Sequence, residues 1–167
     1  MIESQIALVE SNDGDREKEL DYRLLGNAHE DVLTAFEAAL KVAFRQLAAM
    51  KTDDGDEPPS PPTPNVFQNI IKGAKTYRRI GIELYESLDD IQLKSLSDHV
   101  QRRHVIGHNL GIADDLFTQH TDSGRVGQTV SIVAEDIRAF GGLCRQVVKH
   151  VDQCLAWTDV TYDVKSS

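Results

Sequence analysis

Residues 28–51 read AHEDVLTAFEAALKVAFRQLAAMK, and this stretch decides the fold. Its bulky apolar residues recur every three or four positions and share one helical face: Val32, Leu33, Phe36, Leu40, Ala43, Phe44 and Leu47. Asn27 fits an N-cap position and Glu30 follows three residues later, which is close to a capping box. The pattern predicts a long amphipathic helix whose apolar face must be covered by other helices.

Three more segments carry the same helical periodicity, at about residues 65–88, 89–103 and 131–157. In the last of them, the Gly141-Gly142 pair interrupts the apolar seam and predicts either a kink or the close approach of another helix. Four helices with apolar stripes bury those stripes most simply against one another. We therefore predict an all-α fold, an up-and-down helical bundle of four to five helices.

Acidic and proline-rich stretches indicate the domain organisation. Residues 1–24 are polar and acidic, and they predict an N-terminal arm that is frayed or partly helical. Residues 25–167 then form a single helical domain, long enough for a full-sized core. All five prolines lie between residues 58 and 64, so we expect an exposed Pro-rich loop at 53–64.

The net charge of −9 argues against broad, non-specific binding of nucleic acid. The charge is unevenly distributed, however. Residues 1–64 contain 6 basic and 14 acidic groups, residues 111–167 contain 5 and 8, and residues 65–110 contain 7 and 5. The middle third, with a net charge of +2, is therefore where a phosphate backbone would be tolerated.

Cysteine content and hydropathy indicate the compartment. Cys144 and Cys154 fall ten residues apart on one predicted helix, about 15 Å along its axis, which is too far for a disulfide within the chain. The chain lacks a run of ~18 apolar residues, and its N-terminus lacks a basic segment followed by an apolar one. These features predict a cytoplasmic protein with reduced thiols and no membrane partner.

Residues 101–111, which read QRRHVIGHNLG, form the segment best suited to chemistry, and Gly111 ends the helix predicted there. Arg103 falls on the buried side of that helix, where an arginine is costly unless it has a partner. Arg103 and His108 are separated by four residues, and ten arginines and six histidines produce an arginine–histidine pair with a gap of four to six residues about once by chance. The neighbouring residues must therefore supply the specificity.

In this context the segment resembles the HEPN family of helical domains. Arg103, His104 and His108 match the family signature of an arginine, a polar residue and, a few residues later, a histidine. Further residues are similar to a subset of the family: Asn109, Gly111, Asp114 and the Gly127-Gln128 pair before the last helix. The resemblance covers roughly residues 65–155, and the acidic start and the Pro-rich loop have no counterpart in it.

The resemblance implies a mechanism. Many family members are metal-independent endoribonucleases, often toxins or defence effectors, that dimerise so that two motifs face each other. It therefore implies an RNA substrate, a homodimer and an antitoxin or other regulatory protein as a further partner. His108 would be the general acid or base, and Arg103 would bind the phosphate. Other substrate contacts would come from His104, Arg102 and Asn109, and contacts to the RNA backbone from Lys72, Lys75 and Arg79 if their faces converge.

Two other interpretations stay open. Arg102 and Arg103 are also favourable as basic residues near a helix C-terminus, in which case the domain is a non-catalytic dimerisation module that binds a partner protein or a nucleotide. A zinc hydrolase would use His104 and His108, but Val105 stands where the zinc-protease pattern needs a glutamate, and a third ligand would have to come from elsewhere. We therefore predict no metal and no cofactor.

Overall fold

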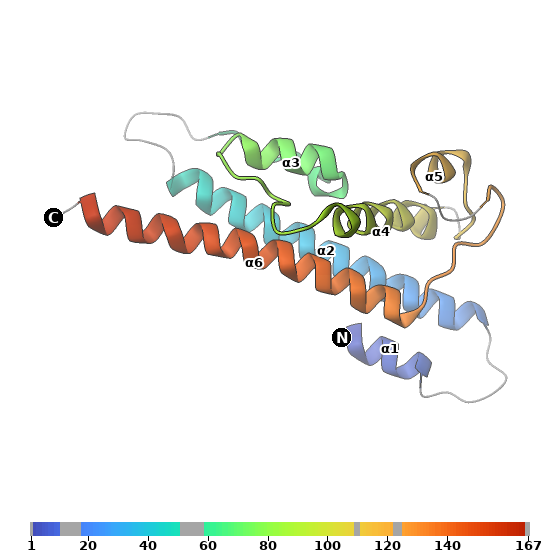
Figure 1. The fold of residues 1–167 in the computed structure, drawn as a ribbon. Coiled ribbons are helices and arrows are strands. Elements are labelled where there is room, and N and C mark those ends of the chain that lie inside the picture. The colour runs from blue at the N-terminus through green and yellow to red at the C-terminus, as the bar shows by residue number, and fades with distance from the viewer. Residues whose placement is uncertain (1, 11–17, 51–58, 109–110, 122–124, 166–167) are drawn as a thin grey trace.

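The structure, a computed structural model, describes residues 2–10, 18–50, 59–108, 111–121 and 125–165. These residues form six α-helices and one short 3-10 helix, and they contain no β-strand (Figure 1). The all-α bundle predicted from the sequence is thus confirmed. In chain order, the elements are α1 (Ile2–Glu10), α2 (Lys18–Met50), η1 (Val66–Gln68), α3 (Ile70–Arg78), α4 (Asp90–His108), α5 (Asp115–His120) and α6 (Ala134–Lys165).

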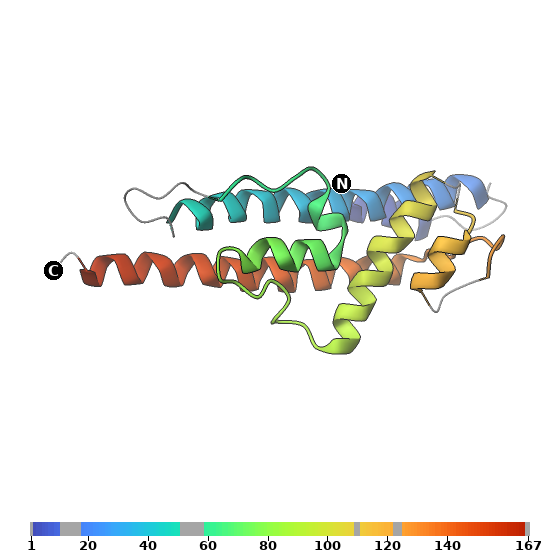
Figure 2. The ribbon, with the colours of Figure 1, turned by 90° about the horizontal axis from the view of Figure 1, so that it is seen from above.

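The long helices α2 and α6 lie side by side along the whole bundle and run in the same direction (Figures 1 and 2). Above this pair lie α3 and α4, and α1 lies on the opposite side. Helix α4 crosses the pair obliquely and runs against α6 (Figure 2). The helices therefore do not simply alternate up and down, because residues 59–65 return along the bundle before α3 begins.

The apolar stripe predicted on α2 is the centre of the core. Leu33, Leu40, Phe44 and Leu47 are at most 1% exposed, and they pack with buried residues of α6 and of the segment around α3. Burying one such side chain contributes about 1.5–3 kcal/mol. The buried hydroxyl of Tyr77 in α3 donates a hydrogen bond of 2.7 Å to the Leu40 carbonyl, so the α2–α3 contact also has a fixed register.

Two predicted helix boundaries are wrong. Helix α2 begins at Lys18, and Asn27, taken as its N-cap, is an exposed residue well inside it. The helix predicted over residues 65–88 ends at Arg78, because Gly81 adopts a left-handed conformation with φ of 69°. Buried apolar residues continue beyond that glycine in a non-helical segment, which is why the apolar spacing resembled a longer helix.

The acidic N-terminal stretch is more ordered than its composition indicates. Residues 2–10 form α1, and residues 18–24 form the first turns of α2. Ile6 of α1 is completely buried in the main core. A single well-placed isoleucine and its apolar neighbours thus anchor a segment whose average polarity predicts an arm.

The expected reason for the Gly141-Gly142 pair is not found. Helix α6 continues through both residues, and a Cβ atom added to either would meet no other atom within 4 Å. Within the described part of the chain, no neighbouring helix therefore requires a glycine at these two positions.

Candidate active site at the end of α4

The segment that resembles the HEPN motif forms the last turns of α4, which lie over the first half of α2 (Figure 2). The two helices approach closely at Gly26 of α2, where an added Cβ would stand 3.0 Å from the Ile106 side chain. A glycine at this crossing brings the end of α4 against α2. The carboxylates of α2 then come within reach of the motif.

Arg103 has the partner that its position on the buried side requires. Its Nε lies 2.8 and 3.1 Å from the two carboxylate oxygens of Glu30, and its Nη2 lies 2.9 Å from one of them. Its Nη1 donates to the side-chain oxygen of Gln68 at 2.8 Å. The guanidinium is thus held on two sides by residues of α2 and η1 that are 73 and 35 positions away in the chain.

Gln68 is itself held by a second ion pair. Its Nε2 donates to Glu37 at 3.0 Å, and Glu37 pairs with Lys41 at 2.8 Å. The Glu37 side chain is 10% exposed, so this pair is among the more buried charged groups of the bundle. Buried carboxylates persist only when they are paired, which makes Gln68 and Glu37 a rigid support behind Arg103.

Arg102 points to the other long helix. Its Nη1 lies 3.1 Å from the Asp136 carboxylate of α6, and its side chain is 19% exposed. The two adjacent arginines of the motif therefore diverge, one toward α2 and one toward α6. Each is neutralised by a carboxylate of the same chain, so neither presents a free positive charge in this structure.

A pair of buried histidines lies beneath the two arginines, where α2, α4 and α6 meet. His29 is 1% exposed and His99 is 6% exposed, and both rings stack on Phe140 with centroids 4.8 Å apart. Burial, together with the nearby charge of Arg102, lowers the pKa of His29 to about 3 and that of His99 to about 4. Both are therefore neutral at physiological pH.

Sequence analysis did not single out His29. The signal was present, because His29 lies four positions before Leu33 and so falls on the buried stripe of α2. A histidine on such a stripe indicates a buried ring, and here the His29 ring stacks on Phe140 and lies 5.6 Å from that of His99.

Gly111 fixes the backbone just after the end of α4. Gly111 has φ of 78°, and its N–H donates to the Val105 carbonyl at 3.1 Å, which closes the end of α4. An added Cβ at Gly111 would stand 1.8 Å from the hydroxyl of Tyr22 in α2. The loop therefore rests directly on the beginning of α2.

Residues near the second glycine pair with this loop. Ile112 and Thr129 form an isolated antiparallel bridge, and Gly127, with φ of 82°, donates to the Ala113 carbonyl at 2.8 Å. Asp114 then caps α5 by accepting a bond of 2.8 Å from the Phe117 N–H. The fold thus brings residues 111–114 together with residues 127–129, which lie thirteen or more positions later in the sequence.

The structure describes only part of the predicted histidine site. His104 and His108 belong to α4, but their side chains lie outside what the structure describes, and Asn109 lies outside the described residues altogether. The two histidines are four positions apart, so their backbone positions share one helical face. Arg103 and His108 are five apart and so leave the helix axis in directions about 140° apart.

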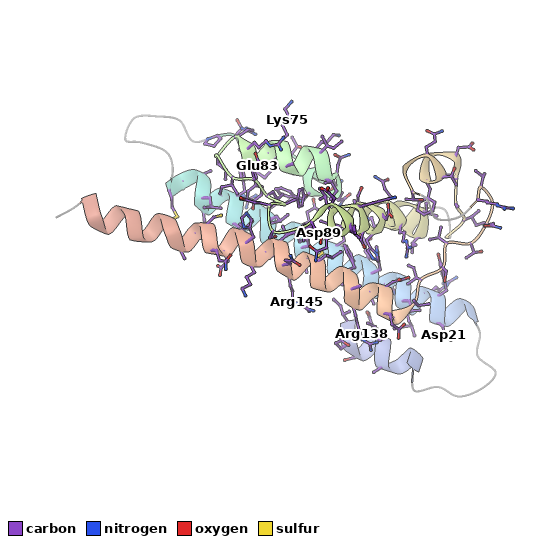
Figure 3. All side chains as sticks on the ribbon, in the orientation of Figure 1. Asp21, Lys75, Glu83, Asp89, Arg138 and Arg145 are labelled. Atoms are coloured by element: carbon purple, nitrogen blue, oxygen red, sulfur yellow. The ribbon has the colours of Figure 1, made fainter. Side chains whose placement is uncertain are left out.

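The basic residues predicted to follow an RNA backbone are not gathered at the motif. Lys72 and Lys75 are exposed on α3, and Arg79 caps the C-terminus of that helix. Lys75 points out from the side of α3 that faces away from α6 (Figure 3). Arg102 and Arg103 turn toward the long helices instead, so the two basic groups do not form one surface.

Other predictions concern metals, thiols and membranes. The described side chains contain no group of three or more histidine, cysteine or acidic residues placed to hold a metal ion; those of His104, His108 and His120 are not among them. Cys144 and Cys154 are not joined in a disulfide, as predicted. In the described part of the chain, no helix has the length and apolarity needed to cross a membrane.

Comparisons of the chain with models of protein families, with curated proteins and with solved structures give no match. The fold and the site together define the class of protein as an all-helical bundle. Near the end of one core helix, two arginines form ion pairs with carboxylates of other helices.

Proposed function

We propose that the protein is a metal-independent endoribonuclease that acts as a homodimer, in the manner of a toxin or defence effector. The observation that carries the proposal is the guanidinium of Arg103. It is held in a fixed plane, it binds a carboxylate through two nitrogens, and its side chain is 26% exposed. An arginine arranged in this way suits a phosphate, which offers the same two-oxygen geometry.

The proposed chemistry needs one proton acceptor and one proton donor. The ribose 2′-oxygen attacks the adjacent phosphorus and gives up its proton to a base, while the bond from phosphorus to the 5′-oxygen breaks and that oxygen takes a proton from an acid. The products are a 2′,3′-cyclic phosphate and a 5′-hydroxyl. His108 is the proposed acid or base, and the facing copy of the motif supplies a second His108.

The other motif residues have supporting roles in this proposal. Arg103 stabilises the negative charge that builds on the phosphate oxygens. His104, Arg102 and Asn109 orient or bind the RNA near the cleaved bond. Lys72, Lys75 and Arg79 form a separate basic surface on α3 that contacts a more distant part of the RNA backbone. An antitoxin or other regulatory protein would restrain such an activity in the cytoplasm.

A second candidate function is a non-catalytic dimerisation module that binds a partner protein or a nucleotide. One observation favours it: both motif arginines are paired with carboxylates of their own chain. In this second candidate function, the two ion pairs have a structural role alone, which is to join α4 to α2 and α6. A purely structural role predicts that their loss lowers stability and changes no chemical activity.

The test is cleavage of varied RNAs by the purified protein, with and without EDTA. Arg103→Ala and His108→Ala are the test variants, and Arg138→Ala is the control, because Arg138 forms a more exposed ion pair with Glu3 of α1, away from the motif and from the basic surface of α3. We expect EDTA-resistant cleavage that leaves a cyclic phosphate. Both test variants should abolish it and Arg138→Ala should retain it, with circular dichroism confirming that all variants are folded.

Other results would assign the protein differently. Cleavage that persists in both folded variants would come from another site or a contaminant. Absence of cleavage across all RNAs, together with a stable dimer, would support the non-catalytic module. Cleavage that EDTA abolishes would contradict the metal-independent mechanism.

A further inference from the structure

We propose that the Glu30 carboxylate occupies the position of a substrate phosphate on Arg103, and that Gln68 is a positioning residue that keeps Arg103 oriented when Glu30 is displaced. This inference rests on the proposed function, because it names the place where that reaction would bind its RNA phosphodiester. It concerns residues of α2 and η1 that lie outside the motif itself.

The first argument is geometric. A guanidinium has two edges that can each bind a planar or tetrahedral oxyanion through paired N–H groups. Glu30 takes the edge formed by Nε and Nη2, with three contacts between 2.8 and 3.1 Å. Gln68 takes the remaining nitrogen, Nη1, at 2.8 Å. An anion can therefore replace Glu30 without disturbing the bond to Gln68.

The second argument is that the two partners of Arg103 differ in how firmly they are held. The Glu30 side chain is 41% exposed and can turn into solvent by rotation about its own bonds. Gln68 is fixed by Glu37, whose side chain is 10% exposed and is paired with Lys41. Of the two, Glu30 is thus the exchangeable partner and Gln68 the permanent one.

The third argument is the charge balance. Arg103 with Glu30 is neutral, and Lys41 with Glu37 is neutral. If Glu30 turns away, the site gains one net positive charge, and a phosphodiester with its single negative charge restores neutrality. Glu30 therefore competes with RNA for Arg103, and the resting site binds RNA weakly.

The test measures binding of a 2′-O-methyl RNA, which cannot be cleaved because it has no free 2′-hydroxyl. Glu30→Gln removes the charge and keeps the size of the side chain. We expect this variant to bind the RNA about tenfold more tightly than the native protein at low salt, with a steeper salt dependence corresponding to about one more phosphate contact. The control is Glu3→Gln, which removes the carboxylate of an exposed arginine pair between α1 and α6, away from both basic groups, and leaves the affinity unchanged.

Two double variants assign the effect to the named residues. Glu30→Gln with Arg103→Ala should lose the whole gain in affinity. Glu30→Gln with Gln68→Met, which keeps the side-chain length but has no acceptor oxygen for Arg103, should lose most of it. In nuclear magnetic resonance spectra, the Arg103 side-chain N–H signals should stay distinct in Glu30→Gln and merge in the Gln68→Met double variant, because only an anchored guanidinium rotates slowly.

Three outcomes overturn the inference: an unchanged or lower affinity in Glu30→Gln, a gain that survives Arg103→Ala, or Arg103 signals that Gln68→Met does not alter. If Glu30→Gln does not fold, Glu30→Asp replaces it. A carboxylate one methylene shorter cannot reach both Nε and Nη2 of Arg103, so this variant should also bind the RNA more tightly than the native protein. Binding is measured without cleavage, so the two proposals can fail separately. If Glu30→Gln binds the RNA more tightly but cleaves no RNA with a free 2′-hydroxyl, the result supports this inference and contradicts the ribonuclease proposal.

Discussion

Acid should destabilise this bundle through the buried histidine pair. His29 and His99 are both nearly inaccessible, their ring centroids are 5.6 Å apart, and both stack on Phe140. Protonating either one would place a positive charge beside the other ring and near Arg102, with only Asp136 acting in the opposite sense. The folded state therefore strongly favours neutral imidazoles.

The sign and the size of the effect follow from the shifted pKa values. Burial lowers the pKa of His29 to about 3 and of His99 to about 4, against 6.5 when they are exposed. Because the unfolded chain binds protons first as the pH falls, the stability contributed by the neutral pair is complete above pH 6.5 and is lost progressively below it. At pH 5, about 1.5 units below the unfolded value, each histidine costs about 2 kcal/mol.

The pair together should thus lower the free energy of unfolding by about 4 kcal/mol between pH 7.5 and pH 5, which is a large part of the 5–15 kcal/mol typical of a domain. The assay is urea denaturation at constant ionic strength. His29→Leu and His99→Leu should each remove about half of the pH dependence. A loss below about 1 kcal/mol in the native protein, or an equal loss in the double leucine variant, would refute the reasoning.

Three further changes test other parts of the fold. Gly142→Ala should raise the free energy of unfolding by up to about 1 kcal/mol, because the new Cβ meets no atom within 4 Å and alanine favours a helix; a lower melting temperature would contradict this. Gly111→Ala should cost about 2–4 kcal/mol in urea denaturation, because φ is 78° and the Cβ would overlap the Tyr22 hydroxyl; a neutral result would show that the loop adapts. Burial raises the pKa of Cys144 to about 12, so iodoacetamide at pH 8 should label Cys154 much faster, as peptide mass analysis can check; equal labelling would mean that α6 opens.

The sequence correctly predicted the parts of the fold that depend only on residues close together in the chain. The stripe of α2, the helix from Asp90 and the long last helix each follow from local apolar spacing, and their buried faces are as expected. The errors arise where local spacing is ambiguous. Apolar residues on both sides of Gly81 recur at helical spacing although the backbone turns at that glycine. Ile6, which is completely buried, is a single apolar position and does not by itself predict a packed helix.

The candidate site could be predicted only in part. The motif residues themselves were found from the sequence, and the need of Arg103 for a partner followed from its position on the buried side. The partners Glu30 and Gln68 could not be identified, because they lie far away in the chain and come close only through the crossing of α4 over α2. The divergence of Arg102 toward Asp136 has the same origin.

The parallel pairing of α2 with α6 also has a consequence for how the protein is made. Synthesis proceeds from the N-terminus, so Glu30 has already left the ribosome when α4 emerges, whereas Asp136 follows Arg102 by 34 residues. The stripe of α2 has no long partner until α6 follows. Contacts between such distant segments form slowly and late. A nascent chain that stops before α6 therefore has an incomplete core and an unpaired Arg102, so the ion pairs of the two motif arginines are complete only after Asp136 has emerged.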